Sequence, residues 1–225
     1  MARKPADQSV HREDIIRAAA EVLQRNGYEA ATMKDIAAAV NLTAASLYHH
    51  FRNKDALLLA VLELGLDAVT RTIEPIACDE QPSDAKLRAM IRAHVVALTE
   101  NTAVGAAMVF EIRSLMHVKA PPRNASAEDR EAFQAFIDRR SAFFAGRDHF
   151  EDLFRVVVTE GIRRGAFRPL DVPIFVKALL GAHNWVGVWY RPDGRLNGAQ
   201  IADLIADTML RGVLAQGWET NLLPD

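Results

Sequence analysis

The chain has one cysteine, Cys78, among 225 residues, and this scarcity excludes an internal disulfide and a cysteine-based zinc site. Its seven histidines supply no metal motif, because no two of them stand at the i, i+4 spacing of a helical zinc site. No glycine-rich phosphate loop follows a strand, and no nucleophile motif is present. We therefore expect no catalytic site, no metal and no cofactor, with an all-helical enzyme as the least favoured alternative.

Long apolar runs are also missing. None approaches the ~20 residues needed to cross a bilayer, and the polar start MARKPADQSV lacks the apolar segment of a secretory signal. We expect a cytoplasmic protein that has no membrane partner. Hydrophobic residues make up 50% of the chain and charged residues 25%, and the formal net charge of -2 favours no particular class of partner.

No alternating strand pattern is present, and helical periodicity continues along the whole chain. Proline and glycine mark the joints between helices, and Gly146 is expected to break one helical stretch into two. The fold class is therefore expected to be all-α. After residue 53 we expect helices over about 54–75, 83–99, 103–116, 127–145, 147–165, 172–190 and 200–216.

Residues 32 to 57, TMKDIAAAVNLTAASLYHHFRNKDAL, are typical of two short helices around a tight turn. Thr32 and Asp35 have the spacing of a capping box at the start of the first helix. Asn41 falls at the turn, where its tolerance of the left-handed conformation is useful, and Thr43 can cap the second helix. The pattern predicts a helix-turn-helix, whose second helix enters the major groove of DNA.

The second helix of this motif has an inner and an outer side. At about 100° per residue, Leu47 and Phe51 fall on the inner side, where they pack on the preceding helices. Small and polar residues on the outer side can approach base edges, and Tyr48 at the rim and Lys54 in the next helix suit phosphates. The residues expected to contact double-stranded DNA are Thr32, Thr43, Ala44, Ala45, Ser46, Tyr48, His49, His50 and Lys54.

The net charge of residues 1 to 56 gives little support for DNA binding, since this segment is close to neutral. DNA affinity must then come from how cations are placed and from two copies binding together. We expect Arg3, Lys4, Arg52 and Lys54 to cluster near the DNA, and we expect one copy alone to bind poorly.

The stretch RAAAEVLQRNGYEAATMKDIAAAVNLTAASLYHHFRNKDALL resembles the DNA-binding domain of the TetR family of one-component bacterial repressors. The match spans residues 12 to 59 and includes the Gly27-Tyr28 turn and the LYHHF-x-NK-x-x-L signature. The family often has glycine where this chain has Asn41 and Ala45. The resemblance implies a three-helix DNA-binding domain over residues 1–56 and a helical ligand-binding and dimerisation domain over residues 57–225.

The stretch GAHNWVGVWYRPDGRLNGAQIADLIADTMLRGVL is similar to the C-terminal end of a TetR subgroup that includes acyl-CoA-responsive repressors. Several of these govern the breakdown of fatty acids, phenylacetate or steroids. The shared pattern is NW-x-x-x-WYRP-x-G-x-L, and EGIRRGAFRPLD and FEIRSL match further upstream. This resemblance implies an acyl-CoA effector.

Small residues recur along the last two expected helices and would let helices of two subunits approach closely. We therefore expect a homodimer held by a four-helix interface. Trp185 and Trp189 belong either to this interface and the core or to a ligand pocket, and both alternatives stay open. The residues expected at the interface are Ala178, Gly181, Ala182, Ile201, Leu204, Ile205, Thr208 and Gly212.

Methionine and phenylalanine along the middle helices suit a flexible acyl chain. Arg113, close to Glu111, is expected to form an internal ion pair or to hold a carbonyl or phosphate group. Six arginines further on could meet the phosphates of coenzyme A or remain solvated: Arg139, Arg140, Arg147, Arg163, Arg164 and Arg168. The residues expected to contact the ligand are Met108, Phe110, Arg113, Phe136, Trp185 and Trp189.

These patterns together predict a repressor of a lipid, aromatic or steroid catabolic operon, which leaves a palindromic operator when an acyl-CoA or similar hydrophobic ligand binds. The alternatives are a drug- or metabolite-sensing repressor of an efflux gene, and an architectural DNA-binding protein without a ligand. In every regulatory reading, two recognition helices must lie ~34–36 Å apart, or a small multiple of this, to read a palindrome.

Overall fold

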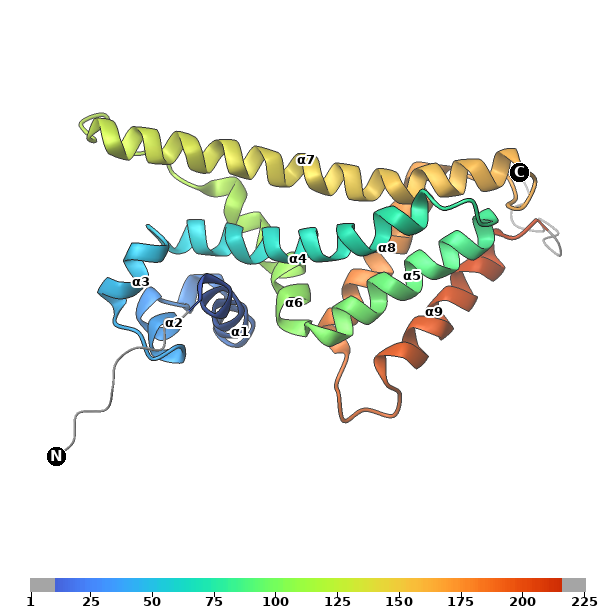
Figure 1. The fold of residues 1–225 in the computed structure, drawn as a ribbon, viewed down its shortest axis with the longest axis horizontal. Helices are drawn as coiled ribbons and strands as arrows, with labels where there is room; N and C mark the ends of the chain where they lie inside the picture. Colours follow the sequence, from blue (N-terminus) through green and yellow to red (C-terminus); the bar gives the residue numbers. More distant parts are fainter. Residues whose placement is uncertain (1–10, 216–225) are drawn as a thin grey trace, which may run out of the picture.

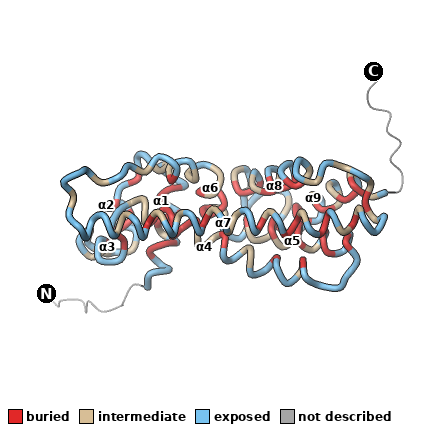
Figure 2. The backbone as a smooth tube through the Cα atoms, turned by 90° about the horizontal axis from the view of Figure 1, so that it is seen from above, coloured by how far each residue is buried: buried red, intermediate tan, exposed pale blue. Residues whose placement is uncertain are grey.

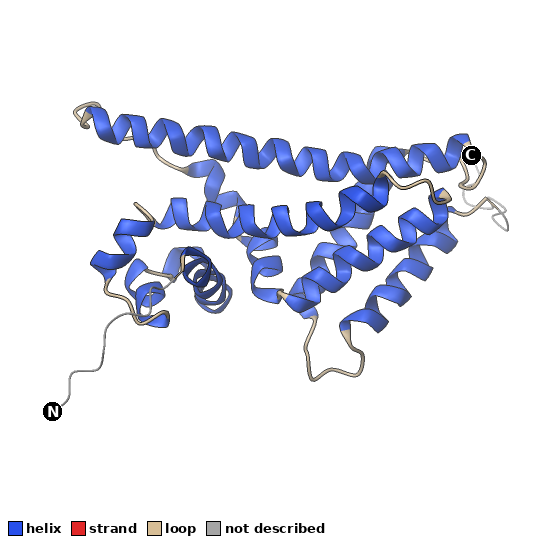
Figure 3. Cartoon of the chain, viewed as in Figure 1, coloured by secondary structure: helices blue, strands red, loops and turns tan. Residues whose placement is uncertain are grey.

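The computed structural model describes residues 11–215, and the all-α prediction is confirmed for this part of the chain (Figures 1 and 3). An isolated bridge between Phe167 and Leu214 is the one extended pairing that the described residues contain. The helices are α1 (Arg12–Ala30), α2 (Met33–Ala39), α3 (Ala44–His50), α4 (Lys54–Ala77), α5 (Ser83–Glu100), α6 (Thr102–Phe110), the 3-10 helix η1 (Ile112–His117), α7 (Ala127–Arg163), α8 (Val172–Trp189) and α9 (Gly198–Val213).

Helices α1 to α3 form a small bundle at one end of the molecule, and α4 leads from it into the larger domain (Figure 1). Helix α7 runs along α4 for most of the length of the molecule, while α5 packs on α9 and α8 at the other end. Buried residues line the inner faces of both regions (Figure 2). The short helix α6 lies between the two regions and contacts α1, α4 and α8.

The local signals of the helix-turn-helix form as expected. The hydroxyl of Thr32 accepts the backbone N–H of Asp35, and the carboxylate of Asp35 accepts the backbone N–H of Thr32, which closes the capping box. Thr43 accepts the backbone N–H of Ser46 at 3.1 Å and caps α3. Asn41 has a φ of 56°, so the turn uses the left-handed conformation.

Two expected helix boundaries are wrong. Helix α7 is continuous over 37 residues instead of breaking near Gly146. A Cβ at this glycine would lie 3.2 Å from Cδ2 of Leu66, so the residue serves close packing of α7 on α4. The expected helix over 103–116 instead ends at Phe110 and continues as η1 after Glu111, which turns the last residues away from the axis of α6.

Glycines hold α6 close to its neighbours. A Cβ added to Gly65 of α4 would lie 2.4 Å from Cγ1 of Val104, far inside van der Waals contact. At the crossing of α6 and α8, a Cβ on Gly187 would lie 3.4 Å from Cα of Gly105. Only small residues allow backbones to pass at this distance, so the position of α6 is fixed from two sides.

In residues 11–215, no single helix is long and apolar enough to span a membrane, although α5 and α6 pass that test jointly as a pair bent by 101°.

The turn of the helix-turn-helix gives a first prediction. Replacing Asn41 by Val places a β-branched residue in the left-handed conformation and should lower the free energy of unfolding by about 1–2 kcal/mol or more. Asn41→Gly is the matched control and should be at least as stable as the parent protein, because glycine adopts this conformation freely. Denaturant melts measure both variants, and an Asn41→Val protein as stable as the parent would contradict the turn geometry.

Candidate DNA interface, effector cavity and dimer surface

The outer side of α3 is open, as a DNA-reading helix requires. Tyr48 has 53% of its surface exposed, and His49, His50 and Ala45 are exposed as well. The inner residues Leu47 and Phe51 are buried, which confirms the predicted inner side. Of the other expected DNA contacts, Thr32 and Thr43 are exposed, while Ala44 and Ser46 are half-buried.

Lys54 requires a correction. Its ammonium group donates to the carbonyls of Tyr28, Glu29 and Ala31, and it lies 4.2 Å from the centre of the Tyr28 ring. These carbonyls are the unpaired acceptors at the end of α1, so Lys54 closes that helix end instead of reaching for a phosphate. The neighbouring Tyr28 hydroxyl donates to Asp55, and burial with this carboxylate raises the pKa of the tyrosine.

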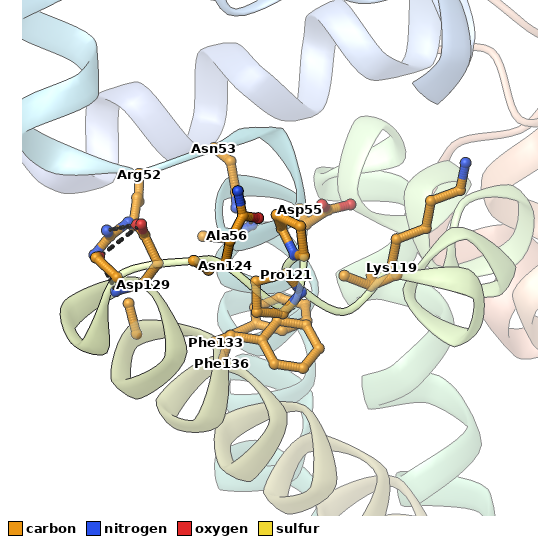
Figure 4. Close-up of a pocket in the computed structure, with 15 residues that line it drawn as sticks. Arg52, Asn53, Asp55, Ala56, Lys119, Pro121, Asn124, Asp129, Phe133 and Phe136 are labelled. Atoms are coloured by element: carbon orange, nitrogen blue, oxygen red, sulfur yellow. Dashed lines mark hydrogen bonds and ion pairs between the residues drawn. The ribbon is translucent and has the colours of Figure 1, made fainter.

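Arg52 also forms its ion pairs within the chain. Its guanidinium pairs with Asp129 (Figure 4). It also lies 3.8 Å from the Glu128 carboxylate, and both acidic residues belong to the first turn of α7. The hydrogen bond from the Ser126 side chain, followed by the pairing with Arg52, lowers the pKa of Asp129. Arg52 and Lys54 are thus engaged by contacts within the chain, and the other expected members of the cation cluster, Arg3 and Lys4, lie outside the described residues.

A junction cavity of about 540 Å³ lies between the start of α4 and the start of α7 (Figure 4). Phe133 and Phe136 form its apolar wall, and Arg52, Asp55 and Lys119 bring charge to the opposite side. Phe136, expected to contact the effector with Met108, lines this junction cavity instead, near the start of α7.

A second, separate cavity of about 330 Å³ lies between α1, α4, α5, α6 and α8, and we name it the effector cavity because it is the candidate ligand site. Its walls are largely apolar with a few polar groups, the combination expected of a small-molecule site. The lining includes the apolar Leu64, Val69, Leu98, Val104 and Met108, the polar His94, Asn101 and Asn184, and Glu13, Arg17 and Arg71.

Most residues expected to contact the ligand lie elsewhere. Met108 is the one expected contact that lines the effector cavity. Phe110 and Trp185 are exposed and meet edge to face with ring centres 6.3 Å apart, and Trp189 is exposed near the turn before α9. Arg113 is exposed too, because η1 rotates it away from the core. Arg113 is therefore absent from the lining of the effector cavity.

The six arginines that were considered for the coenzyme A phosphates do not line the effector cavity either. Arg139 pairs with Glu63, Arg140 donates to the Leu115 carbonyl at 3.0 Å, and Arg164 pairs with Glu160 at 2.7 Å. Arg168 donates to the Gly212 carbonyl at 2.9 Å. These residues, like Arg147 and Arg163 of α7, are absent from the lining of the effector cavity.

Two cations border the effector cavity instead. Arg71 comes from α4 and Arg17 comes from α1, which belongs to the DNA-binding domain. Arg17 lies 3.7 Å from Glu13 one turn earlier, and both side chains are exposed, so this pair is weak and exchangeable. No local sequence pattern indicates a role for these residues, because a place in the cavity depends on how α1 packs against the larger domain.

Helices α8 and α9 leave a stripe of small and apolar residues open. Gly181 and Gly212 have no neighbour within 4 Å of an added Cβ, and Leu204 and Trp185 are more than half exposed. Ala178 and Thr208 are exposed, and Ala182 and Ile205 are half-buried. Ile201 is a correction: with 6% exposure it packs inside the chain and leaves the expected interface. The stripe supports the proposed dimer surface.

Comparison with known proteins decides the family. The model of the tetR family of bacterial regulatory proteins matches residues 15–61, and that of the tetracyclin repressor-like C-terminal domain matches residues 80–213. The chain belongs to the TetR family. These two segments correspond to the helix-turn-helix bundle and to most of the larger helical domain.

Individual TetR-family relatives cover nearly the whole chain. The HTH-type transcriptional repressor KstR2 of Rhodococcus jostii is 26% identical over 219 residues, covering 95% of this chain and 98% of the relative. The structure of AibR in complex with isovaleryl coenzyme A and operator DNA has a TM-score of 0.69 at 25% identity, covering 91% of this chain and 98% of that one. The TetR-family regulator PfmR of Thermus thermophilus has a TM-score of 0.67 at 30% identity, with coverages of 88% and 97%.

Lys54 gives the second prediction. Lys54→Met keeps the aliphatic stem but leaves the carbonyls at the end of α1 without their cation, so the free energy of unfolding should fall by about 1–3 kcal/mol. The salt dependence of DNA binding should stay nearly unchanged. Lys34→Met, at an exposed position of α2, is the control for stability. A salt slope reduced by about one unit, with full stability, would restore Lys54 to the phosphate contacts.

The stripe on α8 and α9 gives the third prediction. Leu204→Asp places a charge in the proposed dimer surface and should shift sedimentation from dimer to monomer and weaken operator binding. Met116→Asp is a matched control, since Met116 is equally open but lies on η1. A Leu204→Asp protein that stays dimeric with normal operator affinity would exclude this surface.

Proposed function

We propose that this chain is a DNA-binding repressor whose effector is an acyl group carried on coenzyme A. The observation that carries the proposal is the position of the effector cavity, which touches α4 and α6 on one side and Arg17 of α1 on the other. One ligand can therefore contact the ligand-binding domain and the DNA-binding domain together. The AibR complex, which holds both isovaleryl coenzyme A and operator DNA, supports this reading.

The volume of the cavity limits what it holds. About 330 Å³ is near the lower end of the ~300–1,000 Å³ range of small-molecule sites. This space suits a short, branched or ring-bearing acyl group with its thioester, and it is too small for the whole coenzyme. The nucleotide would then extend through the mouth, where Arg17 and Arg71 can meet phosphate oxygens.

Release from DNA would follow from the packing of α6. Because Gly65 and Gly187 hold α6 tightly, a ligand pressing on Val104 and Met108 must move α6 together with α4 or α1. Helix α1 carries the recognition helix with it, so the spacing between two recognition helices of a dimer changes. A coupling of about 1–3 kcal/mol between ligand and operator is typical of such systems.

The regulated genes would be those of a lipid, aromatic or steroid catabolic operon, which produces acyl-CoA intermediates. KstR2, a named repressor and a relative over nearly the full length, supports repression over activation. The proposal makes the chain a regulator without turnover, acting at a palindromic operator in the bacterial cytoplasm as a homodimer. A drug- or metabolite-sensing repressor of an efflux gene is the alternative that the experiment must separate.

The fourth prediction tests the effector. Fluorescence anisotropy with labelled operator DNA should show release by acyl-CoA thioesters with short or compact acyl groups, and little release by the free acids or by coenzyme A alone. The acid lacks the phosphates that Arg17 and Arg71 would hold, and coenzyme A lacks the apolar part. Equal release by acids and thioesters, or no release by any thioester, would contradict the acyl-CoA assignment and favour the efflux-sensor alternative.

Two variants test whether the effector binds in the effector cavity. Met108→Trp fills the effector cavity and should abolish release by the active thioester, while operator affinity without ligand stays within a few-fold of the parent value. Arg113→Ala alters an exposed residue outside the cavity and should respond as the parent does. If Arg113→Ala loses the response and Met108→Trp keeps it, the ligand binds elsewhere.

A further inference from the structure

Two histidines that are 89 residues apart in sequence meet in the core of the larger domain. Nδ1 of His94 in α5 lies 3.2 Å from Nδ1 of His183 in α8, and the two rings are nearly perpendicular. His94 is 4% exposed and His183 is fully buried. Phe150 and Phe154 of α7 pack their rings against the pair, so both imidazoles are held in fixed orientations.

Both rings are neutral at physiological pH. Burial lowers the pKa of His94 to about 4, and burial together with the neighbouring His94 lowers the pKa of His183 well below its ordinary value. A neutral imidazole carries one N–H and one acceptor nitrogen. The short contact between the two Nδ1 atoms therefore requires one ring to donate and the other to accept, and two arrangements satisfy this condition.

The surroundings of Nε2 select between these arrangements. Nε2 of His183 is enclosed and has no hydrogen-bond partner in the described part of the chain. If it carried the proton, an N–H would be buried without an acceptor, and such orphaned donors are rarer than orphaned acceptors. The proton of His183 is therefore on Nδ1, where it donates to His94. His94 must then carry its own proton on Nε2.

His94 lines the effector cavity, and within residues 11–215 its one hydrogen-bond partner is His183. We propose that Nε2–H of His94 is a fixed donor for the thioester carbonyl of the effector, and that His183 is a positioning residue that sets its tautomer. This inference rests on the proposed function and assigns the polar anchor that Arg113 was expected to supply. It also implies selection for a carbonyl oxygen at the His94 side of a largely apolar cavity.

Isovaleryl coenzyme A and its thioether analogue S-isopentyl coenzyme A, which lacks the carbonyl oxygen, test the proposal. Isothermal titration of the intact parent protein should show the thioester binding on the order of tenfold or more tightly, because the analogue leaves the His94 donor unpaired. The double variant His94→Leu/His183→Leu should bind both compounds with similar affinity. Removing both partners leaves no orphaned polar atom, so the variant should fold, which its circular dichroism spectrum and thermal melt check.

A second measurement needs no ligand and keeps the proposal testable if the double variant does not fold. Nitrogen-15 spectra of histidine-labelled protein should show the proton on Nε2 of His94 and on Nδ1 of His183. The opposite tautomers, or equal affinity of the parent for thioester and thioether, would overturn the assignment of His94. If the parent protein binds neither of these two compounds and no other thioester of the broader panel, the result would instead contradict the proposed function itself.

Discussion

Close contact of α6 with α4 and α8 is the constraint on which the rest of the structure depends. Glycines at 65, 105 and 187 remove the side chains that would otherwise separate these helices, and Val104 fills the space that a Cβ at 65 would take. Packing this tight does not deform gradually, so α6 moves as a unit or not at all. The same short helix borders the effector cavity and contacts α1, and it therefore connects this cavity to the DNA-binding domain.

Charged contacts hold the DNA-binding domain in place at two points. At the end of α1, Lys54 binds three backbone carbonyls, and after α3, Arg52 pairs with the first turn of α7. These contacts hold the recognition helix in one orientation relative to α4 and α7. A movement of α6 that reaches the recognition helix must strain or break these contacts. Because Lys54 and Arg52 are partly exposed to solvent, breaking their contacts costs little enough free energy for ligand binding to offset it.

Local sequence signals predicted much of the fold and less of the sites. Capping at Thr32 and Thr43, the turn at Asn41 and the inner side of α3 follow from nearest neighbours, so the helix-turn-helix was predictable. The predicted helix break at Gly146 was wrong, because this glycine serves packing on Leu66 of a helix that is distant in sequence. The same limit applies to the effector cavity, because tertiary packing alone brings Arg17, His94 and His183 to this region. Phe110 and Arg113 were expected to contact the ligand from their place in the sequence, but both are exposed.

We propose that a ligand in the effector cavity moves α1 and so changes the spacing of the two recognition helices in a dimer. Spin labels on Arg25→Cys in α1 of each protomer, in a Cys78→Ser background, report this spacing by electron–electron distance measurement. The account predicts that an operator-releasing acyl-CoA shifts the distance distribution, and that Met108→Trp abolishes the shift. An unchanged distribution in the presence of a ligand that releases the operator would contradict it.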